Sequence, residues 1–419
     1  MRNRRGVMIA RCIGILLCAL LIGFNYGEQM RLIRALPGET YIDEKSEGLF
    51  AGLHAPFGVR VNEEGRAVSG DLGESLQPAA NGGYFATVEL FGFIPLKQVR
   101  FLDRSEVRVM PGGQSVGVTL YTKGALVVGM GTVNTGEGAG ICPAQEAGIH
   151  VGDVILYADA QEVDDADHLV RICNAATGEI SMKVLRGEDM HTLSLRPVQD
   201  AEDGVYKMGM WVRDSTAGIG TLSFYSMRTM RYGALGHPIT DVDTGSRLSV
   251  KNGEIIHSSV LGVSAGISGV PGEIRGAFSM LSQRLGTIDT NCAIGIYGEM
   301  YADSVNPIYP QGVLLAYPEE VRMGPAVLLT TVDSEGVKAY TCEILKAYPQ
   351  SSAAGKGMVI RITDPELIEK TGGIVQGMSG SPILQDGKLV GAVTHVFVND
   401  PLKGYCIYAL WMQELCGDT

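Results

Sequence analysis

Residues 377–382 (GMSGSP) have the types and spacing that most directly suggest chemistry in this chain. A serine hydroxyl can attack a carbonyl carbon if nearby backbone amides stabilise the oxyanion that forms. In a tight turn the amides of Gly377 and Ser379 can supply two such donors, and Gly380 keeps side-chain bulk away. We interpret Ser379 as a candidate nucleophile with the Gly377 and Ser379 amides as its oxyanion hole. Because serine, glycine and proline are also ordinary turn residues, these six residues alone fit a β-hairpin corner equally well.

A serine nucleophile needs a base, most often a histidine, and the chain has seven histidines. Four of them lie before residue 200 in segments without this motif: His54, His150, His168 and His191. His257 alternates with apolar residues as an ordinary strand residue would. His395 lies on the strand after the serine turn, where it could line a substrate cleft, although a structural placement is favoured. His237 lies in a loop between Gly236 and Pro238, and we predict that it is the base.

The third member of such a site is a carboxylate that orients the imidazole. The candidates are Asp241, Asp243, Asp289 and Asp364. Asp364 ends a strand-like segment 15 residues before the serine, whereas Asp241 is close enough to His237 to be a turn residue. The residues themselves leave the choice open.

The composition indicates a globular chain of short strands. The 419 residues are 45% hydrophobic and 19% charged, and the 56 glycines and 17 prolines favour tight turns over long helices. The net charge is −12, with no Lys/Arg block outside the N-terminus, which argues against nucleic acid as a partner. No cofactor or metal site is expected.

The N-terminus predicts export. Basic residues up to Arg11 are followed by an apolar run over Cys12–Phe24, as in a secretory signal or a short membrane anchor. No clean cleavage site precedes Glu28, so we expect an uncleaved signal anchor over residues 1–28 and a location outside the cytoplasm for the rest. The six later cysteines have wide, irregular spacings, which favours free buried thiols.

Two segments precede the part that contains the serine. Residues 29–100 read as a membrane-proximal β-rich region without recognisable chemistry. Residues 101–200 resemble a PDZ domain, since Ala147–Ile155 (AGIHVGDVI) matches a PDZ signature. Val116, Gly117 and Val118 match the loop that receives a peptide carboxylate in such domains, so we predict a peptide-binding site there.

Residues 201–419 contain regular short strands bounded by turn residues, as in an all-β sandwich or barrel. Three strings, residues 233–241 (GALGHPITD), 372–388 (GGIVQGMSGSPILQDGK) and 391–401 (GAVTHVFVNDP), resemble the stage IV sporulation protein B family. The resemblance covers roughly residues 100–419. It implies a mainly β chain with an N-terminal membrane anchor, a PDZ-like domain and a trypsin-like β-barrel serine peptidase domain.

The resemblance also implies roles for individual residues. It points to His237, Asp364 and Ser379 as the catalytic triad of a serine endopeptidase. It implies a peptidase that cleaves itself and a membrane-bound regulator of an intramembrane metalloprotease, so that a late sigma factor is activated. The implied location is the space between mother cell and forespore, anchored or released. The alternative is a non-catalytic PDZ scaffold or binding protein.

Overall fold

The computed structural model describes most of the chain after the N-terminal segment. It describes residues 27–36, 39–41, 49–50, 52–63, 66–68, 84–102, 107–136, 140–279, 281–350 and 352–417. The predicted signal anchor therefore lies almost wholly outside the described residues. Among the helices of these ranges, none combines the length and apolar character needed to cross a membrane. The chain divides into two compact units, Met1–Glu106 and Val107–Thr419.

The first unit contains a five-stranded sheet in the order β1-β5-β4-β2-β3. Its elements are α2 (Glu28–Ala35), β1 (Glu39–Tyr41), β2 (Phe57–Glu63), β3 (Arg66–Val68), β4 (Tyr84–Leu90) and β5 (Ile94–Leu102). Ile33 of α2 is buried in one core with Val88 and Val99 of the sheet. Burying these side chains gives the unit a core of its own.

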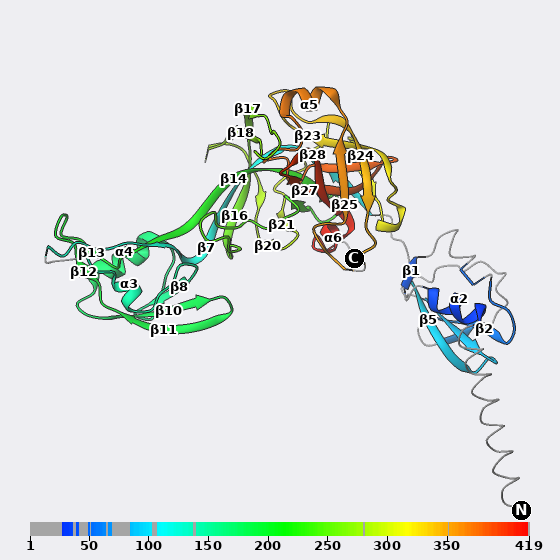
Figure 1. Ribbon diagram of the computed structural model, residues 1–419, viewed down its shortest axis with the longest axis horizontal. Coiled ribbons are helices and arrows are strands. Elements are labelled where there is room, and N and C mark those ends of the chain that lie inside the picture. Colours follow the sequence, from blue (N-terminus) through cyan, green and yellow to red (C-terminus); the bar gives the residue numbers. More distant parts are fainter. Residues whose placement is uncertain are drawn as a thin grey trace, which may run out of the picture. The chain divides into compact units, whose positions relative to one another are not determined.

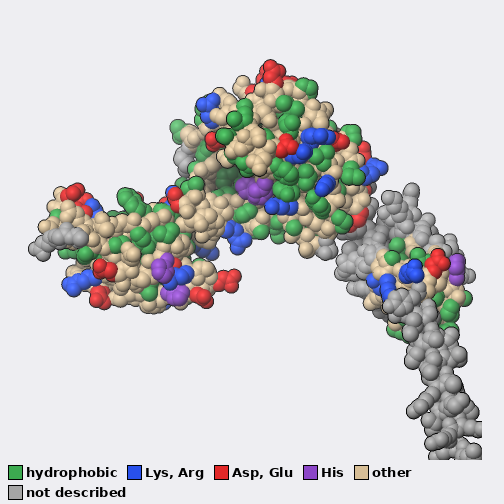
Figure 2. Space-filling model, viewed as in Figure 1, with side chains coloured by type: hydrophobic (Ala, Val, Ile, Leu, Met, Phe, Trp, Pro, Cys, Tyr) green, Lys and Arg blue, Asp and Glu red, His purple; other side chains and the backbone are tan. Residues whose placement is uncertain are grey.

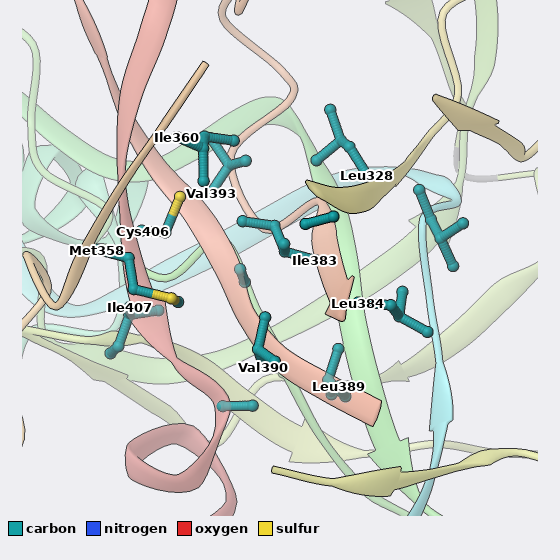
Figure 3. Close-up of a cluster of buried hydrophobic side chains, with 14 of the residues drawn as sticks. Leu328, Met358, Ile360, Ile383, Leu384, Leu389, Val390, Val393, Cys406 and Ile407 are labelled. Atoms are coloured by element: carbon teal, nitrogen blue, oxygen red, sulfur yellow. The ribbon is translucent and has the colours of Figure 1, made fainter. Parts of the chain in front are cut away.

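Six strands of the second unit close into a barrel, which we call the second barrel. In ring order they are β23 (Gly324–Thr330), β24 (Lys338–Ala347), β25 (Met358–Ile362), β28 (Asp400–Tyr408), β27 (Lys388–Phe397) and β26 (Pro382–Gln385). Alternate side chains point inward, and Leu328, Ile360, Ile383 and Cys406 pack together there (Figure 3). The expectation of a mainly β chain with a barrel is confirmed.

A second ring of strands, the first barrel, precedes it in the chain. Its members are β7 (Ser115–Met130), β14 (Met210–Ser226), β15 (Arg231–Ala234), β21 (Gly295–Glu299), β19 (Arg284–Thr287) and β16 (Val250–His257). A bridge between Gly286 and Met300 joins β19 to the end of β21. Leu222, Tyr232, Ile255 and Ile296 are buried inside.

The two barrels are joined by short strands. β6 (Arg108–Pro111) pairs with β14 of the first barrel and with β22 (Val313–Leu315), which pairs with β27 of the second. The remaining elements are β17 (Ser259–Ser264), β18 (Glu273–Ala277), β20 (Thr290–Cys292), the 3₁₀ turn η2 (Pro318–Glu320), α5 (Pro365–Thr371) and α6 (Ala409–Glu414). Backbone pairing thus connects the two barrels, and each barrel carries one part of the predicted site.

The segment that resembles a PDZ domain is inserted into the first barrel. β7 and β14 pair along most of their length, and their far halves leave the barrel to form the inserted module, residues 125–212 (Figure 1). Its other elements are α3 (Pro143–Glu146), β8 (Val154–Ala158), β9 (Gln161–Glu162), α4 (Ala166–Ala175), β10 (Ile180–Arg186), β11 (Asp189–Leu195), β12 (Val198–Gln199) and β13 (Tyr206–Lys207). Ile155, Leu169 and Met182 belong to its separate core.

This arrangement corrects two expectations. The module does not simply precede the barrels, since residues 107–122 already pair within them. Val116, Gly117 and Val118 also form no loop, because they pair with β14 on one side and with β16 on the other. Both valines are buried, and a Cβ at Gly117 would overlap the ring of Phe278. No edge remains there to receive a peptide.

The six cysteines among the described residues are free thiols, and five of them are buried. Cys342 and Cys406 lie in the core of the second barrel. Burial raises the pKa of Cys342 to about 12, so its thiol stays protonated and inert at neutral pH.

Candidate active site

The turn that carries Ser379 lies between α5 and β26. Gly377 and Gly380 both have φ near 94°, a conformation that glycine adopts without strain. A Cβ at position 380 would overlap the carbonyl oxygen of Thr221 and lie 2.6 Å from the amide nitrogen of Leu235. The glycine at this position therefore lets the turn of the second barrel approach the first barrel closely.

Thr221 of β14 holds this turn from the first barrel. Its amide donates a hydrogen bond to the carbonyl oxygen of Ser379 at 3.0 Å, and its hydroxyl donates to the carbonyl oxygen of Gly377 at 2.7 Å. Because both carbonyls are bound to Thr221, the orientation of the peptide groups in the turn is fixed. No local sequence pattern indicates Thr221, which lies more than 150 residues away in the chain.

The amides proposed for the oxyanion hole are available. Within the described residues, no hydrogen-bond acceptor contacts the amide of Gly377 or of Ser379. By contrast, the amides of Met378 and Gly380 donate to the carbonyl oxygens of Val375 and Val393. The two donors expected from the Gly-x-Ser spacing are thus the ones that the turn leaves free.

His237 follows β15 in the first barrel. The chain turns through Leu235 and Gly236, both with φ between 60° and 70°, and the imidazole is partly buried. Nδ1 donates a hydrogen bond to the carbonyl oxygen of Pro238 at 2.8 Å. Burial lowers the pKa of His237 below its ordinary value near 6.5, and the Pro238 carbonyl opposes this shift in part. The neutral imidazole therefore has Nε2 free to accept a proton.

His237 and Ser379 line the same cleft, with a volume of about 680 Å³. Strand β14 contributes Thr216–Ile219 to the wall, and the second barrel contributes Ile374–Gly377 and Thr394–Val396. Among the described residues that line it, the ionisable side chains are two histidines, and the others are apolar or neutral polar. Histidine side chains lie beside a hollow in the barrel surface (Figure 2). The cleft brings the predicted nucleophile and base together.

His395 is the second histidine of the cleft. It lies on β27, and its ring centroid is 5.3 Å from that of His237. Burial, the neighbouring His237 and Lys356 lower the pKa of His395. The sequence favours a purely structural placement for His395, but the residue lies in the wall of the cleft. Its position on the strand after the serine turn also allows a place there.

Asp364 does not contact His237 in this structure. One carboxylate oxygen accepts hydrogen bonds from the amides of Glu366 and Leu367, and the other from the amide of Thr341 at 3.1 Å. Asp364 is therefore the N-cap of α5, with Pro365 at the first helical position. This helix ends at Thr371, with Gly372 as its C-cap, and the chain then leads into the serine turn.

The other candidate carboxylates have partners of their own. Asp241 and Asp243 form ion pairs with Arg213, and Asp289 lies 3.4 Å from Arg231. In the described part of the chain, the group that contacts Nδ1 of His237 is thus the Pro238 carbonyl rather than one of these carboxylates.

The inserted module has a separate groove of about 420 Å³ between α4 and the start of β14. Val170, Tyr206 and Trp211 line it, and all three are exposed. Gly209 has φ of 73°, and within the described residues no acceptor contacts the amides of Met208 and Gly209. Gly131 donates to the carbonyl of Gly209, so by alternation the amide of Met210 points toward the open edge of β14.

The comparisons with known proteins identify the family. A model of the SpoIVB peptidase S55 family matches residues 204–413, half of the chain, and this range includes His237, Asp364 and Ser379. No curated protein matches the chain. Among solved structures, the chain is similar to the inactive form of the Rv3671c protease, with 15% identity, a TM-score of 0.27 and coverage of 47% of this chain and 81% of that one. The active form of the same protease from M. tuberculosis has 17% identity, a TM-score of 0.27 and coverage of 49% and 76%. The chain belongs to the SpoIVB peptidase S55 family and is a serine peptidase.

Proposed function

We propose that Ser379 is the nucleophile and His237 the general base of an endopeptidase that cleaves extended polypeptides. The observation that carries the proposal is that the two side chains, one from each barrel, line one cleft beside two amides without acceptors. In the first step Nε2 of His237 takes the proton of Ser379 while Oγ attacks the scissile carbonyl carbon. The amides of Gly377 and Ser379 stabilise the oxyanion, each worth about 3 kcal/mol in such sites.

The remaining steps return the proton. Protonated His237 donates it to the leaving amine nitrogen as the C–N bond breaks, which leaves an ester on Ser379. His237 then deprotonates a water molecule that attacks this ester, and the acid product leaves with Ser379 restored. The Pro238 carbonyl keeps the proton on Nδ1 throughout and so presents Nε2 to the serine.

Asp364 supports this site as a helix cap. The resemblance to the family implies that it orients His237, yet its oxygens bind three backbone amides. We therefore assign it the positioning of α5 and of the turn that follows.

A cleavage assay tests the catalytic roles. Purified Ser379→Ala and His237→Ala should fail to cleave a fluorescently labelled unfolded protein that the wild type degrades, while their melting temperatures stay within a few degrees. Cleavage by folded Ser379→Ala at the wild-type rate would refute the assignment.

The groove of the inserted module is the second part of the proposal. An extended peptide would add a strand to the open edge of β14, with its terminal carboxylate at the Met208 and Gly209 amides and its last side chain against Trp211. The PDZ-like peptide site that we propose is therefore residues 208–212. Fluorescence of Trp211 should report binding of a short peptide that ends in valine, and the same peptide with an amidated C-terminus should bind at least about tenfold more weakly.

The biological setting is the third part of the proposal. We propose that the enzyme is tethered by its N-terminal segment outside the cytoplasm, cleaves itself, and cleaves a membrane regulator during sporulation. The family name and the predicted signal anchor support this. In a spore-forming host whose own copy carries no active serine, wild-type chain should restore sigma-factor activation and Ser379→Ala should not. Restoration by Ser379→Ala would contradict the setting.

A further inference from the structure

Two consecutive residues of β14, Arg213 and Asp214, lie between the groove and the catalytic cleft. The register of β14 against β7 shifts between Arg213 and Ser215, so Asp214 is left out of the regular pairing. Such irregularities redirect side chains relative to a regular strand. Here one side chain contacts the loop of His237 and the other contacts the helix of the groove.

Arg213 holds the loop that carries His237. Its guanidinium pairs with the carboxylate of Asp241 through Nη1 and with that of Asp243 at 2.7 Å through Nη2. The Asp241 side chain is fully buried, and its other oxygen accepts hydrogen bonds from the amides of Asp243 and Thr244. Asp241 is four residues after His237, so Arg213 holds the loop that presents the imidazole one short step beyond it.

The same loop is also held at Ile239 by a neutral contact. The side chain of Asn291 bonds both the amide and the carbonyl of Ile239, at 2.8 Å each. Asn291 and Arg213 thus both hold the loop of residues 237–245, and Arg213 supplies the contact that comes from the strand shared with the inserted module.

Asp214 contacts the helix of the groove instead of the loop of His237. Its carboxylate accepts a hydrogen bond of 2.8 Å from the amide of Ala166, the first residue of α4. This helix forms one wall of the groove through Leu169, Val170 and Cys173, and β14 forms the other. A peptide between α4 and β14 would press directly on the two elements that Asp214 joins.

We propose that Arg213 is a positioning residue for His237, and that Arg213 and Asp214 together make the reactivity of His237 depend on occupancy of the groove. The occupant is an extended polypeptide end with a free carboxylate. The coupling rests on the peptide binding proposed above, whereas the positioning role of Arg213 does not. Arg213 and Asp214 belong to the same strand, and the structure describes the contacts that each of them makes.

The test compares full-length variants by the rate at which a fluorophosphonate probe labels Ser379 across a range of pH. Arg213→Met should label about 10- to 100-fold more slowly, and Arg213→Lys should recover part of the rate because it still pairs with one carboxylate. Since Arg213→Met leaves Asp241 buried and unpaired, the double variant Arg213→Met/Asp241→Asn removes that charge. It should fold like the wild type and still label slowly.

The matched control is Arg322→Met, which removes an exposed ion pair with Asp386 remote from both sites. It should label at the wild-type rate. A folded double variant that labels at the wild-type rate with an unchanged pH profile would overturn the positioning role.

Coupling is measured separately from binding. The valine-ended peptide should change the labelling rate of the wild type at least about threefold. In Arg213→Met it should bind with the same affinity by Trp211 fluorescence but leave the rate unchanged, and in Asp214→Ala a saturating concentration of the peptide should leave the rate unchanged. If the peptide changes the labelling rate of these variants as much as that of the wild type, the connection is refuted. Absence of peptide binding to the wild type refutes the groove and the coupling, and leaves the effect of Arg213 on His237 to be judged by the labelling rates alone.

Discussion

The hydroxyl of Ser379 donates a hydrogen bond to the carbonyl oxygen of Thr394 at 3.1 Å, although His237 lines the same cleft. Attack on a substrate needs that proton to go to the imidazole instead, so the hydroxyl must rotate away from Thr394 when a substrate enters. The side chain of Thr394 is itself bonded to the carbonyls of Gly355 and Tyr405, which fixes this part of β27. In this structure the Ser379 hydroxyl is therefore bonded to Thr394 rather than to the imidazole of His237.

The two roles available to Asp364 predict opposite results for one substitution. As a helix cap it can be replaced by asparagine, whose side-chain oxygen accepts the same amide bonds, so Asp364→Asn should keep its peptidase rate within about threefold. Asp364→Ala should lower the free energy of unfolding by about 1 kcal/mol and slow cleavage through the serine turn. Rates of peptide cleavage and urea unfolding curves check this.

The result that contradicts the capping role is a loss of about 10,000-fold in Asp364→Asn with unchanged stability. Loss of that size follows when the carboxylate beside a catalytic histidine becomes an amide.

The pH dependence follows from the burial of His237. Its pKa lies below 6.5 in the folded protein, so the neutral, basic form persists on mild acidification and is lost as pH falls through that lowered pKa. The rate of Ser379 labelling should therefore be constant above pH 7 and decline with a midpoint below 6.5. His257→Asn, which alters an exposed histidine of β16, should leave the curve in place, and a midpoint above 7 would contradict the account.

We expect that Gly380 cannot be replaced because neighbouring backbone atoms occupy the position of a Cβ, and not because of its φ angle. Gly380→Ala forces a methyl group into the backbone of Thr221 and Leu235, and we expect a loss of at least about 3 kcal/mol of stability together with activity. Gly387 also has positive φ but has open space around its Cβ position. Gly387→Ala should thus cost only about 1 kcal/mol and remain active, as thermal unfolding and labelling can show. Equal effects of the two substitutions would argue against the close approach.

The inserted module contains an ion pair whose carboxylate is buried. The fully buried carboxylate of Asp153 binds Arg186 through both oxygens, at 2.7 and 2.8 Å, and also accepts from the amide of His150. Asp153→Ala should lower module stability by about 2–3 kcal/mol, seen in the unfolding transition followed by Trp211 fluorescence. Asp386→Ala, in an exposed pair with Arg322, should change stability by less than about 0.5 kcal/mol. An unchanged unfolding transition in Asp153→Ala would show that the ion pair adds nothing to the stability of the module.

Local patterns predicted the features that depend on a few neighbouring residues. The Gly-x-Ser turn and the loop of His237 each lie within a short stretch, so a short motif and elimination among the histidines indicated them, and the cleft brings them together. Asp364 also carried a local signal, since aspartate followed by proline and glutamate is typical of a helix start. The resemblance to the family led instead to a triad role.

Features that depend on distant pairing could not be located in this way. Val116–Val118 matches a glycine loop in sequence, but its two neighbouring strands come from residues more than 90 positions away. The insertion of the module was missed because each half of β7 and β14 has the length of an ordinary strand. Arg213 gave no signal, since its partners Asp241 and Asp243 resemble turn residues until the fold places them beside it.

The most direct test of the central claim, that His237 activates Ser379, is the labelling of full-length protein by a fluorophosphonate probe with the modified residue identified by mass spectrometry. We expect label on Ser379, none in Ser379→Ala, and a rate about 100- to 10,000-fold lower in folded His237→Ala. Label on another serine, or an undiminished rate in His237→Ala, would contradict it.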